Sequence, residues 1–226
     1  MPAPAIELRR LTKIYREGQN ERVVFREVDV TIAPGAIVVL LGRSGSGKST
    51  FLNMLAGIDL PTAGAVIVGG TDLARIDEQA RTLFRRRHVG FVFQFFNLIP
   101  LLTVEENLRL PLELTGQDDH AGRARARRLL ERVGLADRQA SYPEQLSGGE
   151  QQRLAVARAL VHEPTLILAD EPTGNLDADT AAEGVDLLEG LAREGRKTLV
   201  MVTHSREVVG VADRVLTVQH GRLVEG

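Results

Sequence analysis

One eight-residue segment, residues 42–49, most constrains the fold of this chain. It reads Gly-Arg-Ser-Gly-Ser-Gly-Lys-Ser, which fits the pattern G-x-x-x-x-G-K-S, and it directly follows the apolar run 37–41. In this pattern a buried strand leads into a glycine-rich loop, whose backbone amides surround a phosphate at the start of a helix. The sequence therefore predicts a strand–loop–helix unit in an α/β fold, with a phosphate-binding P-loop at its centre.

Each residue type in the P-loop suits one part of a nucleoside triphosphate. The loop amides would surround the β-phosphate, Lys48 would reach the β- and γ-phosphates, and the Ser49 hydroxyl would bind Mg²⁺. Thr50 opens the helix that follows. The full match to the pattern disfavours the alternative, a glycine-rich turn without a ligand. The expected nucleotide contacts are Gly42, Ser44, Gly45, Gly47, Lys48, Ser49 and Thr50.

A second helix start with anion-binding character lies at residues 146–153, Leu-Ser-Gly-Gly-Glu-Gln-Gln-Arg. Ser147 can cap this helix, and Glu150 follows at the spacing of a capping box. Gly148 and Gly149 leave the backbone amides uncovered, and the helix dipole favours negative charge there. The chain therefore carries two predicted phosphate sites of different design.

Together these two segments resemble the ATP-binding-cassette (ABC) ATPases, whose LSGGQ signature binds the γ-phosphate held by the opposite subunit. The resemblance implies ATP and Mg²⁺ as cofactors and an ATP-dependent head-to-tail homodimer. It also implies an L-shaped α/β fold: a P-loop NTPase (RecA-like) core with an N-terminal antiparallel β subdomain and an inserted α-helical subdomain. We expect one domain over residues 1–226, with the core lobe at about 1–94 and 162–226 and the helical subdomain at about 95–161.

The resemblance assigns roles at further motifs, which follow in the family's order. After the apolar run 166–169, Asp170 would hold Mg²⁺ and Glu171 would act as the general base toward the attacking water, as in a Walker B strand. Gln94 matches the Q-loop, which contacts Mg²⁺ and water, and His204 matches the switch histidine on the γ-phosphate. The expected catalytic residues are thus Glu171, His204 and Gln94. The expected Mg²⁺ ligands are Ser49, Gln94 and Asp170.

Two more residues are assigned to the nucleotide site on shorter patterns. Asp177 ends a segment that matches the D-loop, which crosses the dimer interface toward the partner's site. The alternative for Asp177 is a helix cap, and one residue can serve both purposes. Tyr15 matches the aromatic residue that stacks on adenine in this family.

Three segments, 95–100, 102–107 and 173–177, resemble the ATPases of lipoprotein-release and macrolide-export systems. This implies an integral membrane permease as partner, with an amphipathic coupling helix docked on residues 97–107. The cargo stays open, because cell-division ATPases and bacteriocin or peptide exporters share much of the pattern. A soluble ABC ATPase for DNA ends, ribosomes or Fe–S assembly is the alternative, and a switch with negligible hydrolysis is a third. Glu171 and His204 argue against such a switch.

Composition limits the partners and the compartment. The net charge of −2, the absence of Trp and 4% aromatic residues disfavour a nucleic-acid partner. With zero Cys, disulfides and thiolate metal sites are excluded. The first residues carry no signal-peptide pattern, and no apolar run approaches the roughly 18 residues that span a bilayer. We therefore expect a cytoplasmic protein, held on the inner face of the membrane through the permease.

Apolar periodicity predicts the remaining elements. Val24, Val28, Val30 and Ile32 alternate as in a half-exposed sheet, and the runs 37–41, 166–169 and 198–202 are continuous, as in buried parallel strands. Helices are predicted at residues 107–114, 123–133, 150–161 and 181–193, and a hairpin turn at 220–221. We interpret the arginines of 123–128 as a solvated helix face. Residues 85–87 could face a membrane subunit or lipid headgroups.

Overall fold

The computed structural model describes residues 3–18, 20–205 and 207–226. Its centre is a six-stranded sheet in the order β10-β9-β3-β8-β7-β6. All neighbouring strands pair in parallel except β10 with β9, which form an antiparallel hairpin. The three continuous apolar runs occupy the adjacent positions β3, β8 and β7, which confirms them as buried parallel strands. The strands are β3 (Ile37–Leu41), β6 (Val89–Phe93), β7 (Leu166–Asp170), β8 (Thr198–Thr203), β9 (Arg214–Gln219) and β10 (Arg222–Glu225).

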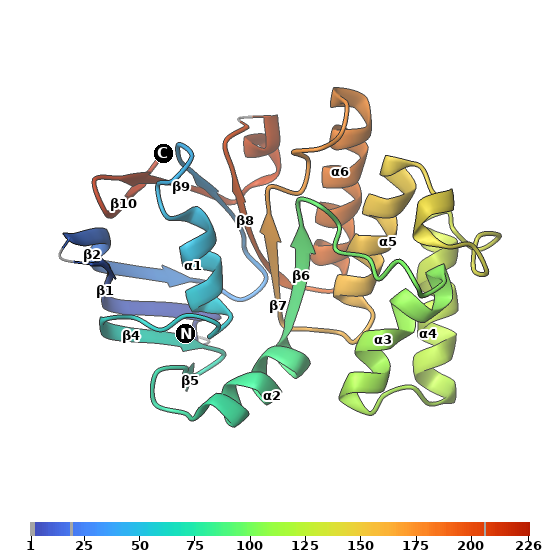
Figure 1. Ribbon diagram of the computed structural model, residues 1–226, viewed down its shortest axis with the longest axis horizontal. Helices are drawn as coiled ribbons and strands as arrows, with labels where there is room; N and C mark the ends of the chain where they lie inside the picture. The colour runs from blue at the N-terminus through green and yellow to red at the C-terminus, as the bar shows by residue number, and fades with distance from the viewer. Residues whose placement is uncertain (1–2, 19, 206) are drawn as a thin grey trace.

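A second, antiparallel sheet is built mostly from the N-terminal part of the chain, in the order β2-β1-β4-β5. Val24, Val28 and Ile32 are buried in it and Val30 is half-buried, which confirms the predicted alternation. Figure 1 shows this sheet at one end of the molecule, beside α1. The strands are β1 (Ile6–Glu17), β2 (Asn20–Ile32), β4 (Ala63–Val68) and β5 (Thr71–Asp72).

The four helices predicted from periodicity are present, each beginning two or three residues earlier than the pattern indicated. Residues 94–165 contain helices and no strand, as expected. One helix, α2, was not predicted, because it has no buried residue and so no apolar stripe. The α-helices are α1 (Lys48–Leu55), α2 (Glu78–His88), α3 (Val104–Thr115), α4 (His120–Arg132), α5 (Gly148–Leu160) and α6 (Ala178–Glu194). Two short 3-10 helices are η1 (Pro143–Gln145) and η2 (Glu207–Val211).

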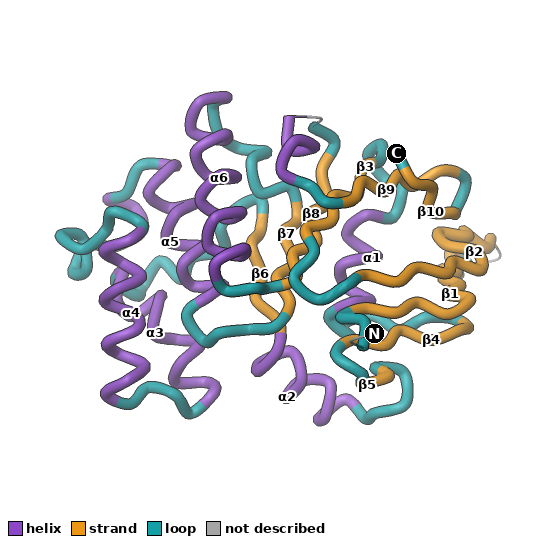
Figure 2. The backbone as a smooth tube through the Cα atoms, turned by 180° about the vertical axis from the view of Figure 1, so that it is seen from behind, coloured by secondary structure: helices purple, strands orange, loops and turns teal. Residues whose placement is uncertain are grey.

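Strand β3 separates two apolar clusters, one on each face of the parallel sheet. Ile37 and Val39 belong to the cluster that α3, α5 and α6 complete, whereas Val38 and Leu40 belong to the cluster of α1 and the antiparallel sheet. Both views show α3–α6 at one end of the molecule and the antiparallel strands at the other (Figures 1 and 2). Because both faces are covered, the central strands have no polar side to expose, and their sequences are continuously apolar.

Two surface features complete the description. Arg125 departs from the predicted solvated face, because its guanidinium donates to the Val161 carbonyl at 2.6 Å and to Gln117 at 2.7 Å. The predicted hairpin turn is present, with His220 and Gly221 both at positive φ. Across residues 3–18, 20–205 and 207–226, no helix combines the length and the apolar character needed to cross a membrane.

Candidate active site

The parallel sheet brings three sequence-distant motifs to one edge. Leu41 pairs with Thr203 and Asp170 pairs with Val202, so β3, β8 and β7 end side by side. Polar residues that follow parallel strands therefore meet at the carboxyl edge, where open α/β sheets bind ligands. The Lys48 ammonium lies 3.4 Å from one oxygen of Glu171, and Nδ1 of His204 lies 2.9 Å from the other.

The P-loop has a backbone that only glycine adopts without strain. Gly45 and Gly47 have φ of 73° and 105°, and a Cβ on Gly47 would lie 2.3 Å from a methyl carbon of Val24. Lys48 is only 8% exposed, and its ammonium donates to the Gly42 carbonyl at 2.9 Å. The loop is thus already folded around the lysine that would meet the phosphates.

The start of α1 is left available for a ligand. Gly47 is its N-cap and provides no side-chain cap, so no side chain satisfies the first amides. Nearby, the buried Ser46 hydroxyl has no hydrogen-bond partner among the described residues. Uncapped amides at a helix start, together with the positive end of the helix dipole, form an anion site.

Glu171 is held in its ionised form. Burial alone would raise its pKa, but hydrogen bonds from His204 and Thr203, together with the Lys48 charge, hold the pKa of Glu171 below its ordinary value. The backbone N–H of His204 also donates to Glu171 at 3.2 Å. Glu171 therefore points two carboxylate oxygens toward two different neighbours, at a left-handed backbone position with φ of 45°.

Asp170 and Ser49 form the oxygen donor set of the predicted metal site. Burial raises the pKa of Asp170, while the hydrogen bond from Ser49 partly offsets that rise. A half-buried carboxylate beside a hydroxyl is the hard oxygen set that Mg²⁺ prefers, and a cation there would relieve the cost of partly burying the charge. The residues present therefore fit Mg²⁺.

Gln94 reaches the same edge of the sheet. Phe93 pairs with Asp170, so Gln94 lies one position beyond that pair. Its backbone carbonyl accepts from Asn175 at 2.8 Å, and a Cβ on Gly174 would lie 2.7 Å from its side-chain nitrogen. Gln94 thus packs against the segment before Asp177, which links the Q-loop to the D-loop within one chain.

The predicted signature forms a capped helix start. The Ser147 N–H donates to Glu150 at 2.7 Å, and the Glu150 N–H donates to the Ser147 hydroxyl at 3.3 Å, which confirms the capping box. A Cβ on Gly149 would lie 2.8 Å from Thr180, at the start of α6. Asp177 caps α6 through the Thr180 N–H, so the cap interpretation of Asp177 is confirmed.

The two predicted phosphate sites are far apart within one chain. The buried side chains of α1 pack on one face of the parallel sheet, and those of α5 pack on the other. Figure 1 shows the two helices on opposite sides of β7 and β8. A single chain therefore does not bring its own signature to its own P-loop.

Tyr15 lies against the first turn of α1. Its hydroxyl is 2.5 Å from Asp59 and 3.3 Å from the Thr50 hydroxyl. Arg22, which faces Tyr15 across β1 and β2, donates to the Gly45 carbonyl at 2.7 Å. The sequence interpretation missed Arg22 and Asp59, since neither belongs to a local motif and both contacts join distant segments.

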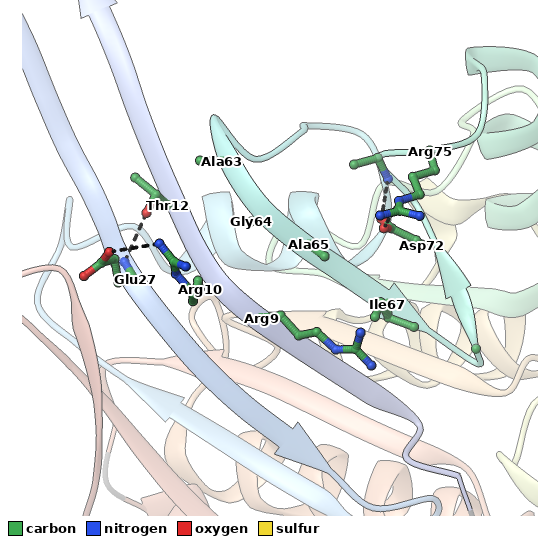
Figure 3. A pocket seen from close by; sticks show the side chains of 12 residues that line it. Arg9, Arg10, Thr12, Glu27, Ala63, Gly64, Ala65, Ile67, Asp72 and Arg75 are labelled. Atoms are coloured by element: carbon green, nitrogen blue, oxygen red, sulfur yellow. Dashed lines mark hydrogen bonds and ion pairs between the residues drawn. The ribbon is translucent and has the colours of Figure 1, made fainter.

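A shallow hollow on the outer face of the antiparallel sheet lies away from these residues. Figure 3 shows its lining, where Arg10 pairs with Glu27 and Arg75 pairs with Asp72. Arg9, also in the lining, pairs with Glu7. None of the predicted site residues is among the described residues that line it. Its cations are matched by carboxylates of the same chain, so it adds nothing to the nucleotide site.

A groove with exposed apolar residues lies between the parallel sheet and α3. Its lining includes the half-buried Phe91 and the exposed Ile99 and Leu114, together with Arg86 and Arg158. Beside it, Phe95 and Leu101 are 72% and 86% exposed. Such a concentration of exposed apolar side chains is typical of a protein contact surface. The segment 97–107, expected to receive a permease, borders this groove.

Comparisons with known proteins agree with the geometry. Residues 25–174 match the family model described as ABC transporter. An ABC transporter ATP-binding protein of Mycobacterium tuberculosis is 52% identical over 221 residues, covering 98% of this chain and 89% of that protein. The lipoprotein-releasing system ATP-binding protein LolD of Xanthomonas campestris is 46% identical over 223 residues, covering 99% and 93%.

A solved structure extends the similarity to three dimensions. The dimeric post-hydrolysis structure of the ATP-binding cassette MJ0796, bound to ADP and Pi, superposes with a TM-score of 0.87 at 41% identity. The match covers 98% of this chain and 97% of that one. Because a family model matches residues 25–174 and relatives match nearly the whole chain, the chain belongs to the ABC transporter family, as an ATP-binding cassette that binds and hydrolyses ATP.

Proposed function

We propose that this chain is the ATPase subunit of a membrane transporter of the lipoprotein-release or macrolide-export type. It works at the cytoplasmic face as a homodimer, in which each ATP lies between the P-loop of one chain and the signature of the other. The observation that carries the proposal is the separation of α1 and α5 on opposite faces of the sheet. One chain alone offers half of each composite site.

The proposed roles follow from the contacts at the sheet edge. Lys48 and the P-loop amides bind the phosphates, and Glu171 orients the attacking water and takes its proton. His204 positions Glu171 through the 2.9 Å contact. Ser49 and Asp170, with Gln94 at the same edge, would hold Mg²⁺. When bound, Mg²⁺ neutralises charge on the β- and γ-phosphate oxygens.

The remaining nucleotide contacts come from the base side and from the partner chain. Tyr15 supports the adenine ring. Ser147, Gly148 and Gly149 bind the γ-phosphate in trans, and Asp177 approaches the partner's site. The Gln94 carbonyl accepts a hydrogen bond from Asn175, so a shift of Gln94 would be passed to the D-loop. This contact couples nucleotide state to the helical lobe, which we place at about residues 95–161.

The groove beside Phe95 and Leu101 is the proposed permease contact. Its position between the parallel sheet and α3 places the docked element next to Gln94. Loss of the γ-phosphate would therefore be transmitted to the permease through Gln94 and the segment that follows it. Relatives named LolD support this branch of the family. The exposed apolar residues fit a docked protein element, which the proposal takes to be the permease.

Two measurements test the proposal. Glu171→Gln should retain ATP binding and accumulate a dimer at saturating Mg-ATP, detected by sedimentation. Leu101→Glu should release the permease during purification from solubilised membranes, while ATP binding persists. Val224→Glu is the matched control, since Val224 is 43% exposed but lies on β10, at the edge of the parallel sheet opposite β6 and the groove. A monomeric Glu171→Gln protein in ATP, with or without permease, would remove support for the composite site.

A further inference from the structure

A cluster of four side chains joins strand β1, helix α1 and the loop after α1. At its centre is Asp59, which uses both carboxylate oxygens. Oδ1 accepts from the Lys13 ammonium at 2.5 Å, and Oδ2 accepts from the Tyr15 hydroxyl at 2.5 Å. Although burial would raise its pKa, these two hydrogen bonds keep the pKa of Asp59 below its ordinary value. The carboxylate is therefore charged when it holds Tyr15.

Lys13 fixes the opposite side of the cluster. It is 8% exposed, and its ammonium also donates to the Leu60 carbonyl at 2.8 Å. The same ammonium lies 4.6 Å from the centroid of the Tyr15 ring, a cation–π contact. Lys13 thus covers one face of the ring, so the proposed adenine contact would use the opposite face.

The cluster is tied to the phosphate-binding part of the site. The Tyr15 hydroxyl is 3.3 Å from the hydroxyl of Thr50, which directly follows Ser49. Arg22, across the strand pair from Tyr15, donates to the Gly45 carbonyl in the P-loop. The ring is consequently fixed relative to both the loop and the first turn of α1. This sets the distance between a base on Tyr15 and the phosphates at Lys48.

We propose that Asp59 and Lys13 are positioning residues, which hold the Tyr15 ring in place as a preformed platform for the adenine base. The inference rests on the proposed role of Tyr15 in adenine binding. A ring held by three neighbours loses little freedom when a base stacks on it, whereas an unheld ring must be ordered at that moment. Asp59 and Lys13 therefore raise the affinity of the protein for nucleotides and leave its affinity for bare polyphosphate unchanged.

The competing explanation is that the Lys13–Asp59 pair only stabilises the packing of β1 against the loop after α1. The two explanations differ in which ligands lose affinity. A structural role would disturb the P-loop and weaken every phosphate ligand, whereas positioning acts only through the base. Comparing Mg-ATP with Mg-tripolyphosphate by calorimetry separates them. The variants are Tyr15→Ala, Tyr15→Phe, Asp59→Asn and Lys13→Met.

Tyr15→Ala should weaken ATP binding by roughly 10- to 100-fold, the size of one base–aromatic stack. Asp59→Asn, Lys13→Met and Tyr15→Phe should each weaken it by roughly 3- to 10-fold, since the ring remains but is less ordered. Tripolyphosphate affinity should stay within about 2-fold of wild type in all of them. In a Tyr15→Ala background, Asp59→Asn should add nothing, because no ring is left to position.

Fluorescence provides an independent readout. The chain has zero Trp and two Tyr, so in a Tyr142→Phe background the emission comes from Tyr15 alone. ATP should change this emission by stacking on the ring, and tripolyphosphate should not. Asp59→Asn should reduce the change at saturating ATP. Tyr142 is 43% exposed and lies beside the signature, outside the cluster, so its replacement leaves the reporter intact.

The outcomes are distinguishable. If Tyr15→Ala leaves the ratio of ATP to tripolyphosphate affinity unchanged, the adenine role of Tyr15 fails and the inference fails with it. If Tyr15→Ala lowers that ratio but Asp59→Asn and Tyr15→Phe do not, the platform stands and the positioning inference is overturned. Equal loss for both ligands in Asp59→Asn also overturns it. Should Asp59→Asn not fold, Tyr15→Phe removes the Tyr15–Asp59 hydrogen bond by deleting its donor and decides the question.

Discussion

The starts of α1 and α5 are both glycine-rich and both predicted to meet phosphate, yet they are built differently. At α1 the N-cap is Gly47, with φ of 105° and no side-chain cap. At α5 the N-cap is Ser147, which forms a reciprocal capping box with Glu150. The first is a helix start whose amides no side chain caps, and the second is a helix end already satisfied by its own side chains.

This difference indicates how each helix start contributes to ATP binding. The amides of α1 gain hydrogen bonds only when phosphate arrives, and Lys48 lies ready beside them, so the P-loop can bind nucleotide within one chain. The start of α5 is stable without a ligand, as a surface exposed in the monomer must be. It adds affinity only when a second chain presents its γ-phosphate. Binding and dimerisation are therefore separable by mutation.

The largest effect should come from the α1 side. Lys48→Ala removes the charge that meets the β- and γ-phosphates, and we expect hydrolysis to fall by roughly 100-fold or more, with nucleotide binding weakened as well. Equilibrium binding and phosphate release assays measure the two losses. Lys197→Ala is the control, since Lys197 lies before β8 at the end of the sheet remote from the P-loop. Wild-type hydrolysis by Lys48→Ala would mean that the P-loop assignment is wrong.

The α5 side should lose dimerisation and keep monomer binding. Ser147→Arg places a bulky cation where the partner's γ-phosphate would lie, so hydrolysis should be abolished while ATP affinity of the monomer stays near wild type. Sedimentation in Mg-ATP and a nucleotide-binding assay test the two parts separately. Unimpaired hydrolysis by this variant would remove the main distinction between the two helix starts.

Mixing Ser147→Arg with Lys48→Ala makes that test sharper. In a mixed dimer one composite site carries both defects and the other is wild type. Activity that appears only in the mixture would show that each site is made from two chains. If both sites must act together, the mixture stays inactive while mixed dimers still form, which sedimentation can verify.

The sequence predicted the parts of the fold that rest on local pattern. The runs that became β3, β7 and β8 are continuously apolar because both sheet faces are covered, and this is visible in the sequence itself. The capping box of Ser147 was likewise readable, because it depends on residues three positions apart. The family resemblance implied that the motifs share one nucleotide site, and the order of the strands came from the structure alone.

Other features could not be read locally. Helix α2 follows a good cap at Asp77 but buries none of its residues, so periodicity gives no signal. The sequence pattern predicted an exposed side chain for Arg125, but Arg125 binds the Val161 carbonyl, which lies 36 residues away in the chain. Asp59 holds Lys13 and Tyr15 across similar distances in sequence. A contact between two polar residues far apart in the chain produces no periodicity or local motif, so one sequence alone cannot reveal it.

Stability should also separate the two helix starts. A Cβ on Gly47 would meet Val24 at 2.3 Å in a left-handed backbone, so Gly47→Ala should destabilise the protein by about 1–3 kcal/mol. Gly148 has no positive φ, and its Cβ would lie 3.2 Å from a Leu176 methyl. Gly148→Ala should therefore change stability by less than about 1 kcal/mol. Urea unfolding measures both, and equal costs would contradict the proposed difference in backbone constraint.

The smallest effect concerns the pH dependence of stability, which should have opposite sign at the two sites. The backbone N–H of Ser147 lowers the pKa of Glu150 from its ordinary 4.5, so the ionised side chain stabilises the folded state above that value. This contribution is lost as the pH falls through the lowered pKa. Glu150→Gln should therefore be less stable than wild type at pH 7, and the difference should shrink below about pH 4.5.

Asp170, beside the P-loop, shows the reverse. Burial raises its pKa above the ordinary 3.8, so the group favours the folded state at low pH and this advantage is lost as the pH rises through the raised pKa. Without nucleotide and Mg²⁺, Asp170→Asn should be more stable than wild type at pH 7, and the gain should disappear below about pH 4. Unfolding curves of both variants at pH 7 and at pH 4 supply the comparison. The half-buried charge of Asp170 implies a site that costs stability until a cation binds. If both variants changed stability at pH 7 in the same direction, that interpretation of the α1 side would be wrong.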